Sequence, residues 1–217
     1  MPIHLRYATE ADSAALAHIN AASFSPSIFY QNAFHDVTYS ALYTLKYARS
    51  LQRLIDPRTH NVVAIDTDTG TVVGSARWII PQDRTEPMAE ISEDGQRMAE
   101  NPEQFIPVEV KQEIYASWVN MTKESRKKHL RDDDLLLEYL AIAPDHQGKG
   151  IGSQLLKWGL AQADTLNARI YLEASVDGYL LYSKNGFEVR EEFNLDFSLL
   201  GGNNTGRYIA MIRKPTP

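Results

Sequence analysis

The stretch LLLEYLAIAPDHQGKGIGS, from Leu135 to Ser153, decides how the rest of the chain is arranged. It begins with an apolar run typical of a strand, is interrupted at Pro144, and continues as a loop with a glycine at every second position from Gly148. The segment LLKWGLAQADTL follows with helical periodicity. A glycine-rich loop between a strand and a helix leaves backbone N–H groups free at the positive end of the helix dipole. The stretch therefore predicts a binding site for an anion, most often a phosphate or pyrophosphate.

The composition fits an ordinary globular enzyme and excludes several classes of function. The chain has 217 residues, of which 43% are hydrophobic and 23% charged, enough for one domain with an insertion and a sizeable core. A net charge of -6 argues against a general nucleic-acid surface, so we expect no nucleic-acid partner. There is no cysteine, which excludes disulfides, cysteine-based zinc sites and a cysteine acyl-enzyme.

Targeting and metal-binding patterns are not found in the sequence. The N-terminus MPIHLRYATEAD has no basic start followed by an apolar run, so we expect no signal peptide. No apolar run approaches the ~20 residues of a membrane span, so we expect no membrane partner. The six histidines show no H-E-x-x-H spacing, and we expect no metal. A cytoplasmic location is expected, with a nuclear one left open.

The order of elements predicts a mixed sheet covered by helices, in one domain over residues 1–217. Strands are expected at 3–8, 61–66, 71–80, 135–142, 169–175, 187–197 and 208–214, and helices at 11–24, 40–55, 108–130, 150–167 and 178–185. Residues 81–134 are polar and rich in proline, and we predict that they form an insertion or lid. Four aromatic residues, Phe24, Phe29, Tyr30 and Phe34, either pack in the interior or line a substrate cleft between the first two helices.

Two common anion-binding motifs compete for the glycine loop. A P-loop fails, because Gly148-Lys149 has neither the earlier glycine nor the following Ser or Thr. A dinucleotide fold finds partial support in Glu173, which follows the loop at about the distance of a ribose-binding acid. Its glycine spacing is wrong, however, and too few residues follow for the second half of a doubly wound sheet.

The loop and its flanks resemble the GNAT superfamily of acyl-CoA-dependent N-acetyltransferases. Gln147–Gly152 matches the signature Q/R-x-x-G-x-G/A, LAIAP is similar to the end of the family's fourth strand, and LLKWGLAQAD to its third helix. Gly178–Phe187 looks like the family's L-Y-x-x-x-G-F block. The segment LEASVDGYLLYSKNGF resembles the corresponding segment of uncharacterised fungal members. The resemblance implies the GNAT-type acyl-CoA N-acyltransferase fold, an α/β architecture with a mixed, mostly antiparallel sheet.

The resemblance also implies the residues that hold acetyl-CoA. The strand before the loop separates from its neighbour in this family, which frees backbone groups for the pantetheine arm, and the loop amides hold the pyrophosphate. Ser175 stands where many relatives carry an Asn that bonds the pantetheine, and here the sequence departs from the family. The implied set is Leu140, Ala141, Ile142, Gln147, Gly148, Lys149, Gly150, Ile151, Gly152, Ser153, Ser175, Tyr179 and Tyr182.

Three residues are candidates for catalysis. Tyr182 matches the family's general acid, and a phenol with a pKa of about 10 suits a thiolate of comparable basicity. The N–H of Leu140 would act as an oxyanion donor. Glu138 interrupts an apolar strand on the face expected for Leu136 and Leu140; burial would raise its pKa and make it a base, or an Arg or Lys would pair with it. Glu173 is the second candidate for the base, and water alone the third.

These features predict direct acetyl transfer from acetyl-CoA to a primary amine of a small molecule or peptide, in a ternary complex. Without a cysteine, a route through a thiol intermediate is excluded. The alternative is a non-catalytic acyl-CoA-binding or regulatory module, and an NAD(P)-binding oxidoreductase comes third. The sequence does not distinguish a monomer from a homodimer.

Overall fold

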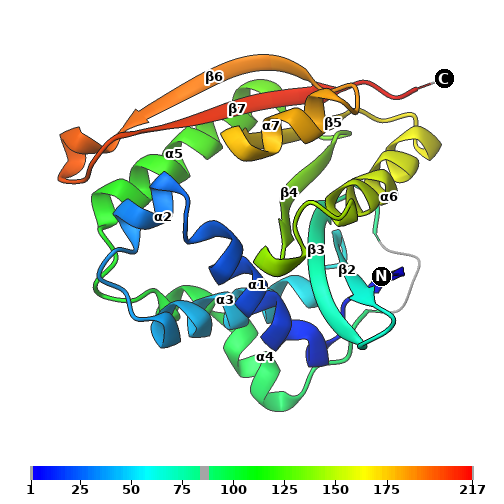
Figure 1. Ribbon diagram of the computed structural model, residues 1–217, viewed down its shortest axis with the longest axis horizontal. Helices are drawn as coiled ribbons and strands as arrows, with labels where there is room; N and C mark the ends of the chain where they lie inside the picture. Colours follow the sequence, from blue (N-terminus) through cyan, green and yellow to red (C-terminus); the bar gives the residue numbers. More distant parts are fainter. Residues whose placement is uncertain (1, 84–87, 217) are drawn as a thin grey trace.

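The computed structural model describes residues 2–83 and 88–216, and in these residues seven strands form one sheet (Figure 1). The strand order is β1-β2-β3-β4-β5-β7-β6, and all neighbours are antiparallel except β4 and β5. The strands are β1 Ile3–Tyr7, β2 Thr59–Asp66, β3 Thr71–Ile79, β4 Leu135–Ile142, β5 Ile170–Ser175, β6 Glu188–Asp196 and β7 Thr205–Arg213. The predicted mixed, mostly antiparallel sheet is confirmed.

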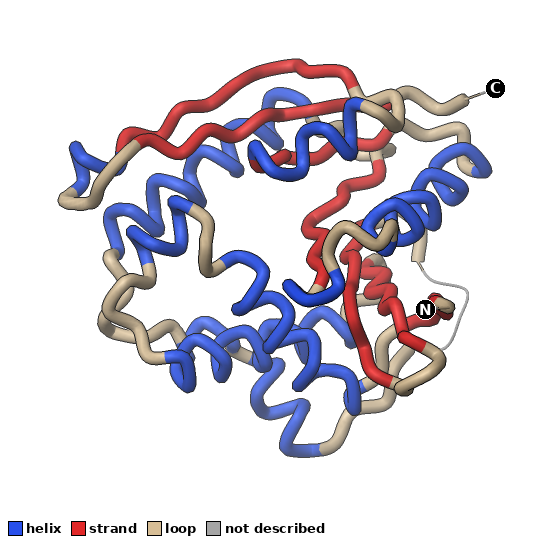
Figure 2. Tube along the Cα trace, in the orientation of Figure 1, coloured by secondary structure: helices blue, strands red, loops and turns tan. Residues whose placement is uncertain are grey.

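Helices cover the sheet (Figure 2). They are α1 Ser13–Phe24, α2 Ile28–Ala33, α3 Tyr39–Leu54, α4 Glu93–Glu100, α5 Gln112–His129, α6 Ile151–Thr165 and α7 Val176–Ser183. The sequence predicted all but α2 and α4. Both are short, and each is fixed by its N-cap, since Ser27 accepts a hydrogen bond from Tyr30 N–H and Ser92 accepts one from Gly95 N–H.

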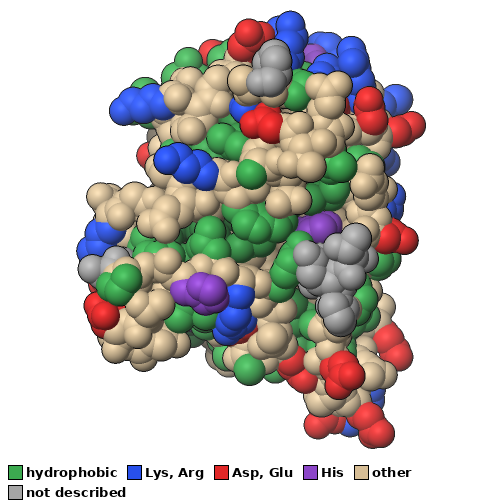
Figure 3. Space-filling view, turned by 90° about the vertical axis from the view of Figure 1, so that its right-hand side faces the viewer, with side chains coloured by type: hydrophobic (Ala, Val, Ile, Leu, Met, Phe, Trp, Pro, Cys, Tyr) green, Lys and Arg blue, Asp and Glu red, His purple; other side chains and the backbone are tan. Residues whose placement is uncertain are grey.

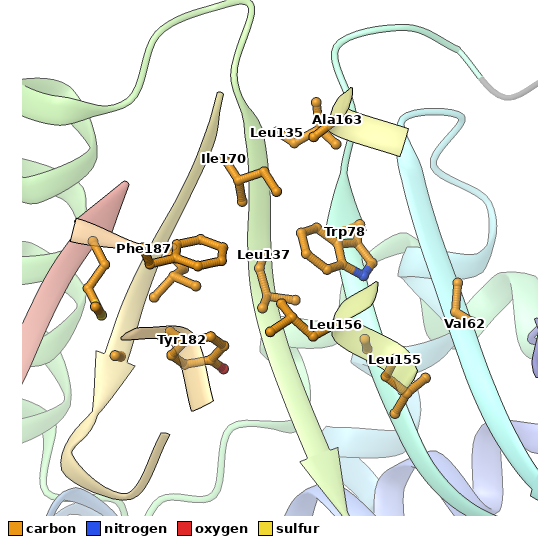
Figure 4. Packing of buried hydrophobic residues seen from close by; sticks show 14 of the residues in the cluster. Val62, Trp78, Leu135, Leu137, Leu155, Leu156, Ala163, Ile170, Tyr182 and Phe187 are labelled. Carbon is orange, nitrogen blue, oxygen red and sulfur yellow. The ribbon is translucent and has the colours of Figure 1, made fainter. Parts of the chain in front are cut away.

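The central core lies between α6 and strands β2 to β5 (Figure 4). Trp78 of β3 is fully buried there, beside Leu155 and Leu156 of α6. A Cβ atom at Gly159 would lie 2.1 Å from the Trp78 ring, so this glycine is required for the helix to approach the sheet. Helix α6 is thereby fixed on β3, and with it the loop that precedes the helix.

The sheet splits between its two parallel strands. β4 and β5 pair only over Leu135–Leu137 and Ile170–Leu172, although both strands continue further. Figures 1 and 2 show β4 running away from β5, β7 and β6 beyond this point. The remainder of β4 stays paired with β3, up to Ile142 opposite Gly74. The edge of β4 that faces β5 therefore lies open, as the resemblance implied.

A β-bulge in β4 sits where the strands separate. Arg77 of β3 faces Tyr139, whereas the next residue, Trp78, faces Leu137, so Glu138 is the additional residue. The bulge changes which side chains share a face: Glu138 lies towards α3 and α5, while Leu140 packs on the core under α6. The expectation that Glu138 and Leu140 share a face is wrong, because the bulge interrupts the alternation.

The side of the molecule shown in Figure 3 has hydrophobic side chains across its middle, with charged groups mainly towards the edges. Within the described residues, no helix is both long enough and apolar enough to cross a membrane.

Candidate functional site

A run of backbone amides without internal partners marks the glycine loop. Within the described part of the chain, none of the N–H groups from Gly148 to Ser153 donates a hydrogen bond, and the first such bond of α6 runs from Gln154 N–H to the carbonyl of Gly150. The last three of these amides form the first turn of the 15-residue α6, at the positive end of its dipole. The predicted anion site therefore has its donors free.

Two glycines give the loop its shape. Gly148 and Gly150 have φ angles of 73° and 79°, a left-handed conformation that other residues adopt at a cost. A Cβ atom at either position would meet no protein atom within 4 Å, so their surroundings are open. Two side chains brace the loop: Gln147 Nε2 donates to the carbonyl of Ile142 at 3.2 Å, and Lys149 Nζ to that of Asp145 at 2.8 Å. An open loop with free donors fits the pyrophosphate of acetyl-CoA.

The unpaired edge of β4 leads from this loop to the point of separation. Leu140, Ala141 and Ile142 pair with β3 on one side and face the split on the other. Ser23 of α1 donates a hydrogen bond of 2.8 Å to the carbonyl of Ile142, which ties the end of this helix to β4. The roles of these three residues in holding pantetheine, and of Leu140 N–H as an oxyanion donor, stay predictions.

Tyr182 of α7 lies on the other side of the split. Its ring packs against Phe187 at a centroid distance of 5.7 Å, and Figure 4 shows its hydroxyl oxygen pointing towards β4. The side chain is buried in the central core, and no hydrogen-bond partner for its hydroxyl is found among the described residues. The hydroxyl is therefore free to donate to a group that enters the split.

Burial raises the pKa of Tyr182 above its ordinary value. The expectation of a phenol with an ordinary pKa is wrong, because the surrounding apolar side chains disfavour the phenolate. A thiolate formed in the same apolar surroundings would lose hydration in the same way, so its pKa would also rise. Tyr182 thus keeps its proton over the physiological pH range and remains suited to donating it.

The two other residues implied by the α7 region have different surroundings. Ser175 is the N-cap of α7, and its Oγ accepts a hydrogen bond from Gly178 N–H at 3.3 Å. Because this hydroxyl already accepts a hydrogen bond at the start of the helix, its contact with pantetheine stays a prediction. Tyr179 is partly buried and packs at the edge of the central core.

Glu138 forms ion pairs with two arginines. Its carboxylate lies 2.7 Å from Arg53 of α3 and 3.3 Å from Arg77 of β3. Burial acts to raise the pKa of Glu138, but Arg77, Arg53 and the more distant Arg126 outweigh it and lower this pKa. The expected rise in pKa is wrong. The paired alternative describes the residue as the structure has it, and a carboxylate held by arginines is a weak proton acceptor.

A Glu138→Gln variant should lose stability in a pH-dependent manner. The pKa of Glu138 is lower in the folded protein than its ordinary 4.5, so ionisation stabilises the fold above pH 4.5. We expect a loss of about 2 kcal/mol at pH 7, which shrinks as the pH falls through the folded pKa. Urea unfolding from pH 3 to 7 measures it, with the exposed Glu109→Gln as control. An equal loss at both ends of this range would contradict the assignment.

Glu173, the second candidate for the base, is also paired. Its carboxylate accepts two hydrogen bonds from Arg126 of α5, at 2.8 and 3.1 Å, and a third from the hydroxyl of Tyr171 at 3.0 Å. Glu173 and Glu138 lie on the side of the split that faces α5. Arg126 of α5 pairs with Glu173, and its charge lowers the pKa of Glu138. With both carboxylates paired, water is the simplest remaining proton acceptor.

Sequence reasoning allowed an Arg or Lys partner for Glu138 as one alternative, but it did not identify which arginines pair with the two carboxylates. Arg77 stands in the apolar run VVGSARWII, as Glu138 does in LLLEYL, and two opposite charges in neighbouring buried strands are a signal for a pair. Lys46 of α3 was also missed, and no pattern in the sequence marks it. Among the described residues, no cluster of three or more His, Cys, Asp or Glu side chains could hold a metal ion.

Comparison with known proteins relates the central part of the chain to a family model. Residues 101–189 match the model of the acetyltransferase (GNAT) domain, a segment that contains α5, β4, the glycine loop, α6, β5 and α7. The resemblance is thereby confirmed over this segment, which is similar to GNAT acetyltransferase domains. A search of curated proteins gives no match. The likeness to fungal members and the status of 81–134 as an insertion stay predictions.

Solved structures share the fold over the whole chain. A histone acetyltransferase and related acetyltransferase from Corynebacterium glutamicum is 21% identical, covers 100% of this chain and 98% of its own, and has a TM-score of 0.64. A phosphinothricin acetyltransferase from Sinorhizobium meliloti, solved with acetyl-CoA, is 17% identical, with coverages of 99% and 89% and a TM-score of 0.57. An N-acetyltransferase from Thermoplasma acidophilum, solved with coenzyme A, is 14% identical, with coverages of 99% and 99% and a TM-score of 0.54.

Proposed function

We propose that this protein transfers the acetyl group of acetyl-CoA to a primary amine of a small molecule or peptide. The observation that carries the proposal is the run of unpartnered amides from Gly148 to Ser153 beside the split between β4 and β5. A mostly antiparallel sheet of this order is not the doubly wound sheet that a dinucleotide-binding oxidoreductase requires. The GNAT match and the neighbours solved with acetyl-CoA or coenzyme A support the same ligand.

Each chemical requirement of the transfer has a candidate group. Acetyl-CoA supplies a thioester carbonyl that the amine attacks directly. The free amides of the loop bind the pyrophosphate, and the open edge of β4 holds the pantetheine and, through Leu140 N–H, the carbonyl oxygen. Water accepts a proton from the ammonium before the neutral amine attacks, and the proton released from nitrogen after attack also passes through water to bulk solvent. Tyr182 donates a proton to the departing sulfur and regains one from solvent.

A non-catalytic acyl-CoA-binding module is the second candidate function. It would use the same loop but would not need a hydroxyl in the split. The direction of the Tyr182 hydroxyl, and its freedom from any partner in the described chain, favour the enzyme.

The test is a thiol-release assay with acetyl-CoA across small amines, peptides and arylamines, paired with calorimetry of coenzyme A binding. We expect binding of coenzyme A and acceptor-dependent thiol release. Binding without release for any acceptor would favour the module, and the absence of coenzyme A binding would contradict both functions.

A further inference from the structure

Lys46 of α3 is a partly buried cation among aromatic rings. Its Nζ lies 5.0 Å from the ring centroid of Tyr30 and 5.8 Å from that of Phe34, both contributed by the α2 segment. Among the described residues, no group pairs with this ammonium or accepts a hydrogen bond from it. An ammonium carries three N–H donors, and the faces of the rings attract its charge without supplying a full acceptor.

The neighbouring cations differ from Lys46 in this respect. Each has a carboxylate partner: Arg49 pairs with Glu103 at 2.9 Å, Arg53 and Arg77 with Glu138, and Arg126 with Glu173. Each arginine of this cluster thus has a carboxylate partner, whereas Lys46 has none among the described residues. A partly buried ammonium without a carboxylate partner either loses its proton or pairs with an anion from outside the chain.

Contacts between rings connect Lys46 to the reaction centre. Tyr30 stacks on Phe24 at a centroid distance of 6.1 Å, and the centroids of Phe24 and Tyr139 are 6.2 Å apart. Tyr139 belongs to β4 and precedes Leu140 at the split. Glu138 and these rings lie on the side of β4 that α1 and α3 cover, whereas Leu140 packs towards α6. An acceptor that reaches the split from the side of α1 and α3 would thus meet Lys46. Of the four aromatic residues, Phe29 and Phe34 are buried in an apolar cluster against which Tyr30 packs, so for these two the interior alternative is confirmed. A lining role for Phe24 and Tyr30 stays a prediction.

The electrostatic surroundings favour an anion next to Lys46. Burial is the largest cause that lowers the pKa of Lys46 to about 7, Arg49 and Arg77 lower it further, and Glu103 opposes them. The tyrosines nearby add no negative charge, because burial raises the pKa of Tyr30 and Tyr139. An anionic group on a ligand would offset the burial and the repulsion at once.

We propose that the acceptor amine also carries a carboxylate and that this carboxylate pairs with Lys46. The inference rests on the proposed acetyltransferase function and names its substrate class: a small molecule with the amine and acid of an amino acid, and an apolar body that fits the rings of Tyr30 and Phe34. Polyamines and basic peptides would add positive charge beside Lys46 and are disfavoured.

The experiment compares matched acceptors on the full chain. Phenylalanine and leucine are each measured beside their amides, their decarboxylated amines and their phosphonate analogues, all with the same primary amine. We expect the wild type to prefer the amino acids. Lys46→Met should lower kcat/KM for them by about 10-fold or more, mainly through KM, and leave the amides within about 2-fold. Lys46→Arg should restore part of the loss, and the exposed Lys214→Met should change nothing.

Each other outcome is decisive. Equal or better acetylation of the amides or simple amines, or an equal loss for all acceptors in Lys46→Met, would overturn the inference while the proposed function stands. Acceptance of phosphonates instead of amino acids would overturn the assignment of a carboxylate. If coenzyme A binds and no amine of any class is acetylated, the proposed function itself fails.

Discussion

Replacing Tyr182 with phenylalanine is expected to lower kcat by a factor of about 100 to 10,000, while coenzyme A binds as in the wild type. The substitution removes only the hydroxyl that points into the split, and the ring keeps its packing against Phe187. Without a proton donor, the sulfur must leave as a thiolate in apolar surroundings, which is costly. Steady-state kinetics with acetyl-CoA, together with calorimetry of coenzyme A binding, measures the two effects separately.

Tyr43→Phe is the control for this variant. Tyr43 lies on α3, where its ring packs between those of Tyr39 and Tyr47. It should retain wild-type kcat. If Tyr182→Phe keeps its kcat as well, the phenol is a core residue and water protonates the leaving sulfur. A parallel loss of coenzyme A affinity would instead indicate that the hydroxyl holds the ligand.

The second large effect concerns the glycine loop. Gly150→Glu should weaken coenzyme A binding by about 100-fold or more, because a side chain and a negative charge would enter the space in front of the free amides. A Cβ at this position meets no protein atom within 4 Å, so the fold should survive. Calorimetry of coenzyme A binding and thermal unfolding of the same variant give the two quantities.

The left-handed conformation of Gly150 adds a cost that any side chain would bear, and the control must include it. Gly201 has a φ of 74° and no atom within 4 Å of a Cβ. It belongs to the connection between β6 and β7, which lies at the end of the molecule away from α6 (Figure 1). Gly201→Glu should therefore lose similar stability and bind coenzyme A normally. Equal binding by the two variants would show that the amides between Gly148 and Ser153 do not hold the ligand.

The sequence predicted the sheet and the loop because both depend on local patterns. Glycine spacing, the break at Pro144 and the helical period after Gly150 all lie within one short stretch, so the anion site could be read from neighbouring residues. The same holds for Tyr182, which a short motif places on α7. Helices α2 and α4 escaped because they have only 6 and 8 residues, too few to show a clear period.

The charges at the site depend on contacts that are distant in sequence. Glu138 meets Arg53 and Arg77 only after the sheet and α3 have assembled, so its lowered pKa could not be foreseen from the apolar run around it. The bulge also reverses the alternation that was used to assign faces of β4. In the sequence Lys46 is an ordinary helical lysine. Its contacts with the rings of Tyr30 and Phe34 form only in the folded structure.

The short pairing of β4 with β5 has a further consequence for how the two parts of the sheet hold together. Among the described residues, three paired positions of β4 and β5 join the part of the sheet formed by β1, β2, β3 and β4 to the part formed by β5, β7 and β6. Side-chain packing below α6 and α7 has to supply the rest. A ligand that lies along the unpaired edge of β4 would act as a partial eighth strand and link the two parts of the sheet. Ligand binding should thus make the protein more rigid and more stable as well as competent for the reaction. Release of the product would remove this added stability.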